Sequence, residues 1–206
     1  WTQVLPNVSG SPMRASDLDI ASDNELWVGI AKNTFSNGGG KIYSSTNGTS
    51  FSLKHSHTTA GRVNIACAPS NANYVYAAFE GASQLSAFKQ TTNDGANWST
   101  KSEPNDVDTG IPATDFTRGQ AWYDLTLDVD PNNMNTVIIG GIDLFKTTNG
   151  GTAWTQISKW SNNNNLASLN ASLVHADQHS VVYKPNSSSI AIFGNDGGVA
   201  YSGNTN

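Results

Sequence analysis

The stretch Thr147-Thr148-Asn149-Gly150-Gly151-Thr152-Ala153-Trp154 decides the fold, because its pattern returns elsewhere in the chain. A second copy runs Thr91-Thr92-Asn93-Asp94-Gly95-Ala96-Asn97-Trp98, and a weaker copy runs Ser44-Ser45-Thr46-Asn47-Gly48-Thr49-Ser50-Phe51. Each copy, called a box below, has Ser or Thr, a short polar residue two positions on, Gly two further on, and an aromatic residue three beyond. The chain also opens on Trp1-Thr2-Gln3-Val4, which matches Trp154-Thr155-Gln156-Ile157.

The spacing of the boxes predicts a repeat architecture. Their closing aromatic residues stand at positions 1, 51, 98 and 154, which are 50, 47 and 56 residues apart. A period of about 40–50 residues is that of four-stranded propeller blades. Ahead of each box, two short apolar runs joined by a Pro, Asn or Ser turn predict a hairpin. We therefore expect an all-β β-propeller of about four four-stranded antiparallel blades, with inner strands near 17–21, 63–68, 124–130 and 179–184.

The boxes resemble the Asp-box, or BNR, repeat of sialidases, sortilin-like receptors, family 74 xyloglucanases and many secreted bacterial proteins. The resemblance covers essentially the whole chain, and it implies a fold more than an activity. In this repeat the Ser/Thr and Asp/Asn side chains hydrogen-bond the hairpin backbone, and Gly supplies a positive φ. The boxes here depart from the family because Asn or Thr stands where Asp is usual.

The two ends of the chain predict an incomplete ring. The chain starts at the last position of one box, and Ser202-Gly203-Asn204-Thr205-Asn206 opens another. We expect one partial propeller over residues 1–206, an arc of a larger ring of roughly 4–8 blades rather than a closed four-bladed ring. Because open sheet edges invite pairing, the rest of the same polypeptide or a partner is expected to cover them. The expected repeats are approximately 1–51, 52–98, 99–154 and 155–206.

Composition limits the function classes. The 206 residues carry a net charge of −5 and no basic stripe, which argues against nucleic acid as a partner. No run approaches the roughly 18 apolar residues that span a membrane, and the 206 residues contain no basic-then-apolar leader. The single cysteine, Cys67, excludes an internal disulfide and is expected to be buried. The surface, rich in Asn, Ser and Thr, is typical of a secreted or cell-surface protein.

Propeller topology places the candidate ligand face on one side. The loops that enter each inner strand share this face with the loops that join the second and third strands, and the boxes lie opposite. Binding residues concentrate on loops that a rigid scaffold holds. The expected face consists of segments 5–16, 52–62, 99–122 and 158–178, together with 30–40, 79–87, 140–143 and 194–198.

The sharpest constellation on that face is His175-Ala176-Asp177-Gln178-His179, followed by Asn195-Asp196-Gly197-Gly198. On a strand, His175, Asp177 and His179 would point the same way. Three interpretations stay open: a polar cluster that orders the loop, a contact to a sugar or other polar ligand, or a divalent metal site. Because the spacing lacks a third spatial anchor, the sequence predicts candidate ligand-binding residues here, no metal site and no cofactor.

Three further candidates come from the long insertions and the few arginines. Trp122 follows the acidic insertion 101–120, and an exposed indole beside Asn and Asp side chains can stack on a sugar. The alternative is that Trp122 only pins its own loop to the sheet. Arg118 and Arg62 lie on expected ligand-face loops and suit a carboxylate, because guanidinium groups bind carboxylates in a bidentate manner.

Two enzyme classes can be compared with the residues. Sialidases carry an Arg-Ile-Pro start that this chain lacks. Family 74 xyloglucanases carry catalytic aspartates in Asp-x-Gly-Gly segments, whereas here Asn195 occupies that position and Asp196 stands one residue late. The pair of motifs is also similar to Asp-box proteins described as glycosyl hydrolases and to cargo of the type IX secretion system. Since glycoside hydrolysis normally needs two placed carboxylates, the leading hypothesis is an extracellular carbohydrate- or protein-binding module without catalysis. The alternative is a glycoside hydrolase, xyloglucanase-like or sialidase-like, whose site further blades complete.

Overall fold

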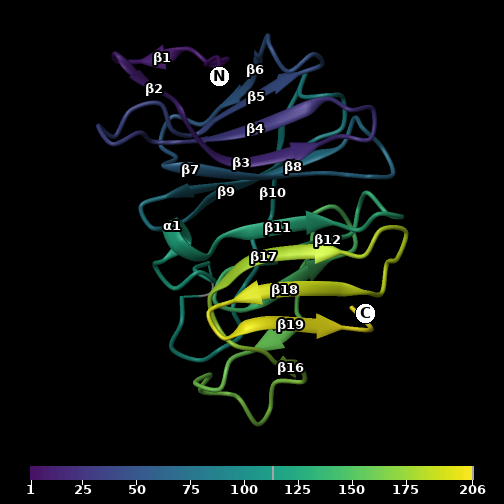
Figure 1. Cartoon of the computed structure of the whole chain (residues 1–206). Helices are drawn as coiled ribbons and strands as arrows, with labels where there is room; N and C mark the ends of the chain where they lie inside the picture. Colours follow the sequence, from purple (N-terminus) through teal and green to yellow (C-terminus); the bar gives the residue numbers. More distant parts are fainter. Residues whose placement is uncertain (113, 206) are drawn as a thin grey trace.

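The computed structural model describes residues 1–112 and 114–205, and most of its ordered structure is β-strand. The strands form successive antiparallel sheets, here called blades 1 to 4, that are stacked from one end of the molecule to the other (Figure 1). Blade 1 has β3 (Arg14–Ile20), β4 (Leu26–Ala31), β5 (Lys41–Ser45) and β6 (Ser52–Ser56). Blade 2 has β7 (Arg62–Cys67), β8 (Val75–Gly81), β9 (Gln84–Thr91) and β10 (Ser99–Lys101).

Blade 3 has β11 (Thr126–Val129), β12 (Val137–Gly140), β13 (Leu144–Thr147) and β14 (Thr155–Gln156). Blade 4 has β17 (Gln178–Tyr183), β18 (Ala191–Asn195) and β19 (Gly198–Ser202). The hairpin of β1 (Asn7–Val8) and β2 (Ser11–Pro12), the parallel pair of β15 (Ser158–Lys159) and β16 (Ser172–Leu173), and α1 (Ala121–Asp124) lie in the connections. The predicted β-propeller of four antiparallel blades is confirmed.

Inner strands β3, β7, β11 and β17 coincide with the four predicted inner strands and pack in that order. Within each blade the strands follow one another as a meander, so β3 pairs β4 and β4 pairs β5. The one helix of the described residues, α1, has four residues, and no described helix is long and apolar enough to cross a membrane. The division of the chain into a single partial propeller with the repeat bounds given above stays a prediction.

The boxes are hairpin turns held by their own side chains. Thr147 Oγ1 accepts hydrogen bonds from the N–H groups of Asn149 at 3.3 Å and Gly151 at 3.0 Å. The amide oxygen of Asn149 then accepts from the N–H groups of Thr152 and Ala153. In the second box Thr91 Oγ1 accepts from Asn93 and Gly95 in the same way. A short hydroxyl and a short amide thus satisfy the turn backbone, which explains why these residue types recur.

The first box is one residue shorter than the sequence alignment supposed. Its hydroxyl is that of Ser45, which accepts from the N–H of Asn47 at 3.3 Å, and Asn47 Oδ1 accepts from Ser50 N–H. The alignment had placed Ser44 and Thr46 in these roles. The strand register agrees with the hydrogen bonds, because Ser44 of β5 lies opposite Ser52 as Lys146 of β13 lies opposite Thr155.

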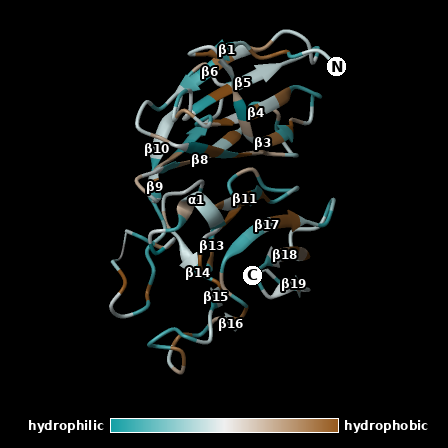
Figure 2. Ribbon diagram, turned by 60° about the vertical axis from the view of Figure 1, so that its left-hand side comes forward, coloured by the Kyte–Doolittle hydropathy of each residue, from teal (hydrophilic) through white to brown (hydrophobic). Residues whose placement is uncertain are grey.

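Apolar residues recur along the strands of the stacked sheets (Figure 2), and separate clusters fill the spaces between neighbouring blades. In blades 2 and 3 the box aromatic residue reaches the blade before it. Trp154 packs edge-on against Phe88 of blade 2 with ring centroids 5.3 Å apart, and Trp98 packs against Trp27 of blade 1 at 6.4 Å. The aromatic residue therefore repeats because each one seals an interface between blades.

Carboxylates also join the inner strands of neighbouring blades. Asp19 accepts from its own neighbour, Ile20 N–H, and across the interface from Cys67 N–H at 2.6 Å. Asp128 repeats the arrangement between blades 3 and 4, where Tyr183 N–H donates at 2.8 Å. The inner strands have a free edge toward the axis of the propeller, so these carboxylates satisfy N–H groups that no strand pairs. Cys67 is buried, as expected.

The two outer faces of the stack are uncovered. Blades 1 and 4 lie at opposite ends of the molecule (Figures 1 and 2). Leu18 of β3 is 69% exposed and Val199 of β19 is 79% exposed, and each is accompanied by other exposed apolar side chains of its blade. These are Ile20 and Leu53 in blade 1, and Val182, Ile192 and Tyr201 in blade 4. The described residues thus form an arc with apolar faces at both ends.

Candidate functional site

Backbone hydrogen bonds join the predicted ligand-face segments beside α1. Lys32 N–H donates to Gly61 O, Ala121 N–H donates to Ser83 O, and Gln178 N–H donates to Gly141 O. Each bond joins two successive blades. It links the segment that enters the inner strand of one blade to the loop between the second and third strands of the blade before it. The boxes make their contacts elsewhere, at the opposite ends of the strands. The side of the molecule that carries α1, at the left in Figure 1, is therefore a continuous surface of loops.

The entry to β17 has an irregular backbone. Gln178 is fully buried, and its side chain donates to His175 O at 2.6 Å and to Ile142 O at 3.3 Å. Asp177 before it has a φ of +63°, in the left-handed region that few non-glycine residues occupy. The register with β18 then shifts between Gln178 and Ser180, so His179 occupies a β-bulge.

This backbone contradicts one expectation. Residues 175, 177 and 179 do not alternate along a strand, because β17 begins only at Gln178. The left-handed turn and the bulge instead re-aim Asp177 and His179, and both then face Asp196. Bulges beside a site commonly re-aim a side chain in this way.

Asp196 lies at the centre of a polar cluster. His179 Nε2 lies 2.7 Å from Asp196 Oδ1, and the Tyr123 hydroxyl donates to the same oxygen at 2.9 Å. The phenol and the imidazole also touch edge to face, with ring centroids 4.7 Å apart. Both hydrogen bonds stabilise the ionised carboxylate, and they lower the pKa of Asp196. The Tyr123 pKa is raised, chiefly because its proton is held by that carboxylate.

Two further carboxyls lie behind Asp196. The amide of Gln120 donates to Asp177 Oδ1 at 2.6 Å and to Asp124 Oδ2 at 3.0 Å, and so bridges them. Burial raises the pKa of Asp124 to about 7, and the charge of Asp177 adds to the effect. The pKa of Asp177 is raised by burial and by its interaction with Asp196. The pKa values of Asp177 and Asp196 therefore shift in opposite directions.

Aromatic surface and a guanidinium complete the cluster. Trp122 is 60% exposed and Tyr123 is 42% exposed, and their rings lie at 44° with centroids 5.6 Å apart. Arg62 holds this segment from below, because its guanidinium donates to Trp122 O at 2.8 Å and to Leu125 O at 3.1 Å. The indole therefore projects from an anchored backbone and is not folded back onto the sheet.

Arg118 lies apart from this cluster. Its guanidinium is 3.0 Å from Asp106, 3.5 Å from Asp108 and 3.7 Å from Asp143, and all three carboxylates are buried. The backbone N–H of Asn165 donates to Asp108, and the amide of Asn163 donates to Asp143. Arg118 therefore ties the two long insertions to blade 3. The side chain of His175 lies over Gly197, where a Cβ atom would come within 2.6 Å of it.

The structure thus gathers Arg62, Trp122, Asp177, His179 and Asp196, and it leaves Arg118 outside. Sequence reasoning did not select Tyr123, Gln120 and Asp124, which bridge the other members. Tyr123 directly follows Trp122 in the sequence, so this position could have identified it as a candidate site residue. Gln120 and Asp124 carried none, because an amide and a carboxyl are common in loops.

The cluster combines exposed aromatic surface with polar groups. An exposed indole and phenol offer flat apolar surface, and Asp196 and His179 offer hydrogen-bonding groups beside it. Among the described residues, no group of three or more His, Cys, Asp or Glu side chains has the arrangement of a metal site. The carboxyls of Asp177 and Asp196 influence each other's titration, and their pKa values shift in opposite directions.

Comparison with known proteins supports the fold and no more. No protein-family model matches the chain, and no curated protein matches it. The GH74 enzyme of Niastella koreensis is 20% identical over 98% of the chain, with a TM-score of 0.55. YCF48 from Cyanidioschyzon merolae is 15% identical over 94%, with a TM-score of 0.53. An auxiliary nutrient binding protein from Bacteroides ovatus is 11% identical over 91%, with a TM-score of 0.54.

The chain covers only part of each similar structure. It spans 36% of the Niastella enzyme, 55% of YCF48 and 46% of the nutrient binding protein. The three proteins have different functions by name, so their shared architecture is a scaffold that carries several activities. Similarity at these identities shows a shared fold alone.

Proposed function

We propose that this chain is part of an extracellular Asp-box propeller and that the cluster beside α1 binds a carbohydrate. The observation that carries the proposal is the exposed Trp122–Tyr123 pair next to the hydrogen-bonded Asp196 and His179. Sugars present flat apolar C–H faces and a rim of hydroxyls, which suit aromatic rings flanked by carboxylate and imidazole groups. The box hydrogen bonds support the Asp-box assignment, since hydroxyl and Asn side chains hold the turns as that repeat requires.

The charge of the cluster favours a neutral or cationic sugar. Asp196 is held ionised by its two hydrogen-bond donors, and Asp177 and Asp124 lie behind it. Arg62 offsets part of this charge, but its donors are used by two backbone carbonyls. An acidic sugar would therefore meet carboxylates without a free guanidinium to bind it.

A glycan array and calorimetry on the longest natural form of the protein test the proposal. We expect binding to a neutral polysaccharide that weakens about tenfold or more, or about 1.4 kcal/mol, in Trp122→Ala. Loss of the acceptor in Asp196→Ala should have a similar effect. Phe35→Ala is the matched control, because Phe35 is 69% exposed and lies outside the cluster. Unchanged binding in Trp122→Ala, or no binding at all, would rule out this site.

The second candidate is a glycoside hydrolase whose site further blades complete. The observation that favours it is the neighbouring carboxyls of Asp177 and Asp196, whose pKa values shift in opposite directions, as those of a paired general acid and its partner do. Retaining enzymes separate their carboxyls by about 5–5.5 Å and inverting enzymes by about 6.5–9.5 Å, so a partner carboxyl from further blades would have to meet one of these spacings.

A panel of chromogenic glycosides separates the two functions. The binding proposal predicts no turnover by the protein, and the hydrolase alternative predicts turnover that Asp196→Asn abolishes. Retention of sugar binding in Asp196→Asn, together with lost turnover, would assign catalysis to this carboxylate and replace the binding-module proposal.

A further inference from the structure

The cluster beside α1 has three carboxyls and little positive charge to balance them. Gln120 bridges Asp124 and Asp177, and Asp177 and Asp196 influence each other's titration. In the described part of the chain, the one ion pair formed with these carboxyls joins His179 to Asp196 at 2.7 Å. An imidazole brings at most one positive charge, so negative charge remains in excess on this surface.

Other carboxyls of the fold are compensated from within the chain. Lys54 Nζ lies 2.9 Å from Asp94 and 3.6 Å from Glu25, and Arg118 faces three buried carboxylates. Asp128 instead accepts two backbone N–H groups. The carboxyls beside α1 have no lysine or arginine at ion-pair distance among residues 1–112 and 114–205. They therefore differ from the carboxyls that only hold the fold together.

Two properties of the cluster point to a cation from outside the chain. Asp124 is fully buried, and its Oδ1 atom has no hydrogen-bond partner. Burial and neighbouring carboxylates also raise the pKa values of Asp124 and Asp177, which is the response expected of carboxyls that lack a nearby cation. Asp196 has a lowered pKa and is partly exposed, so it offers an ionised group to solvent.

The aromatic pair lies directly beside this charge. The Tyr123 hydroxyl donates to Asp196 at 2.9 Å, and the exposed Trp122 ring lies next to Tyr123 with ring centroids 5.6 Å apart. An ammonium group is attracted both to carboxylates and to the faces of aromatic rings. An amino sugar carries its ammonium group on a ring that also has an apolar C–H face. The cluster offers a partner for each of these parts.

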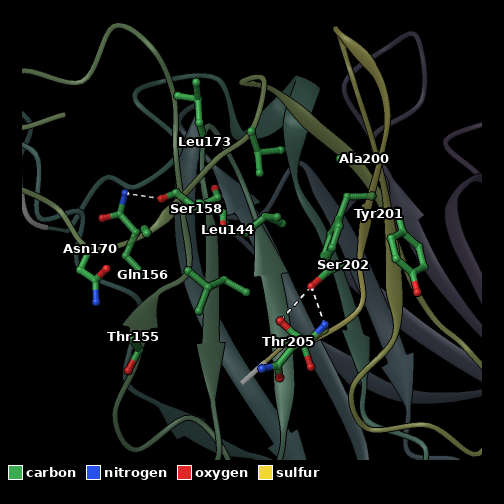
Figure 3. Close-up of a pocket in the computed structure, with 16 residues that line it drawn as sticks. Leu144, Thr155, Gln156, Ser158, Asn170, Leu173, Ala200, Tyr201, Ser202 and Thr205 are labelled. Carbon is green, nitrogen blue, oxygen red and sulfur yellow. Dashed lines mark hydrogen bonds between the residues drawn. The ribbon is translucent and has the colours of Figure 1, made fainter. Parts of the chain in front are cut away.

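The largest cavity of the structure lacks this charge. It has a volume of about 580 Å³ and lies between blade 3 and blade 4 (Figure 3). Leu144, Phe193 and Ala200 supply apolar lining, and Gln156 and Ser158 supply polar atoms. None of the described residues that line it carries a carboxylate, an ammonium or a guanidinium group. A sugar bound in this cavity would therefore not be distinguished by its charge.

We propose that the cluster beside α1 selects sugars that carry a free amino group, with the ammonium on Asp177 and Asp196 and the sugar ring against Trp122. The inference rests on the carbohydrate binding proposed above, and it adds the class of sugar. N-acetylation of the sugar removes the positive charge and keeps the ring and its linkage. The acetylated sugar should therefore lose the ionic contact and keep the aromatic one.

Calorimetry with two matched oligosaccharides tests this inference on the full chain. The probes are a β-1,4-linked glucosamine tetramer and its fully N-acetylated form, at pH 6, where the sugar amine is protonated. We expect the charged tetramer to bind about tenfold more tightly or better, since hydrogen bonds between ions are the strong ones. Added salt should reduce this preference, because the carboxylates are partly exposed. A lysine tetrapeptide of equal charge should not compete.

Three variants locate the groups that recognise the charge. Asp177→Asn and Asp196→Asn should each reduce the preference for the charged tetramer to about threefold or less. The residue at 177 has a φ of +63°, which Asn adopts readily, so Asp177→Asn should fold and keep its melting temperature. Asp23→Asn is the control, because Asp23 is an exposed carboxyl in the turn between β3 and β4. It makes the same change in net charge and should leave the preference intact.

The possible outcomes separate this inference from the function on which it rests. Equal affinity for the two tetramers overturns the selection of amino sugars and leaves carbohydrate binding in place. Binding of neither tetramer overturns both proposals. A preference that persists in Asp177→Asn and Asp196→Asn places the charge recognition elsewhere and overturns the inference. Competition by the lysine peptide at similar concentration would show that the cluster binds cations without regard to the sugar, which also overturns it.

Discussion

At the scale of single residues, two glycines with the same backbone show why the boxes need glycine. Gly151 and Gly119 both have a φ of +82°. A Cβ atom on Gly151 would come within 2.8 Å of the Phe88 ring, whereas nothing lies within 4 Å of the same position on Gly119. The third box therefore requires glycine twice over, for its conformation and for the close approach of blade 2.

The change Gly151→Ala tests that reasoning. Both Gly151→Ala and Gly119→Ala carry the left-handed strain of about 1 kcal/mol. Gly151→Ala should also displace Phe88 and cost about 1–3 kcal/mol more in the free energy of unfolding. Urea denaturation of both variants gives the comparison. An equal loss in the two would show that the Phe88 contact is not tight in solution.

The buried carboxyl of Asp124 predicts a pH dependence of stability. Its pKa of about 7 in the folded protein lies above the value of about 3.9 for an unfolded chain. The stabilisation associated with its bound proton is complete below pH 4 and is lost as the pH rises through 7. We expect Asp124→Asn to gain about 1–3 kcal/mol over wild type at pH 8 and little at pH 5. Urea titrations at both pH values measure this, and a gain that does not change with pH would contradict it.

At the scale of elements, carboxylates hold parts of the fold that no strand pairs. Asp19 and Asp128 join neighbouring inner strands, and Arg118 gathers three carboxylates to fix the insertions on blade 3. These polar contacts lie where loops meet strand edges. The backbone hydrogen bonds between paired strands do not extend to these positions. Their cost is desolvation, which raises the pKa of Asp128 and of Asp143 to about 6.

The link between β11 and β17 can be tested at Asp128. Asp128→Ala leaves the Tyr183 N–H without an acceptor and should cost about 1–3 kcal/mol in unfolding free energy. Asp128→Asn keeps a neutral acceptor and should cost less than half of that at pH 8, because the buried charge is removed. Chemical denaturation distinguishes the two. Equal losses would mean that the charge, and not the hydrogen bond, joins the blades.

The buried cluster around Arg118 predicts a larger effect. Arg118→Met removes the one cation that faces Asp106, Asp108 and Asp143, so uncompensated carboxylates remain buried. We expect a loss of about 3–5 kcal/mol at pH 8. The loss should shrink near pH 5, because Asp143, with a pKa of about 6, then binds a proton. A loss that is the same at both pH values would show that packing of the side chain, not charge, is responsible.

At the scale of the whole molecule, the arc has a sealed middle and open ends. Separate apolar clusters fill the spaces between the blades, and the outer faces of blades 1 and 4 carry exposed Leu18 and Val199. An exposed apolar face of this kind marks a contact surface. The stability of the chain should therefore depend on whether those faces find a neighbour.

This dependence can be measured by varying the protein concentration. The melting temperature of the wild-type chain should rise with protein concentration, because association stabilises the folded state. The double variant Leu18→Ser with Ile20→Ser should lose the rise and change the dilute-limit stability by about 0.5 kcal/mol or less, as exposed positions do. Calorimetry across a concentration series checks both. A large loss in the dilute limit would show that these side chains are already covered within one chain.

The sequence determined the repeat, and with it the blades and their order. A box that satisfies its own turn, an inner strand of apolar residues and a sealing tryptophan are local features, so Thr147, Asn149, Gly151 and Trp154 predict them from spacing alone. The same local logic failed in the first box, where a turn one residue shorter moved the roles to Ser45 and Asn47.

Only the tertiary structure decided the candidate site. Asp177 and His179 meet Asp196 because of a left-handed residue and a bulge, and Tyr123, Gln120 and Asp124 join them from the connection between blades 2 and 3. Arg118, by contrast, is drawn into a buried network by carboxylates on its own insertion and on blade 3. The physical reason is that loop side chains are placed by long-range contacts between blades. Such contacts leave no periodic trace in the sequence, whereas strands and turns are fixed by residues near one another in the chain.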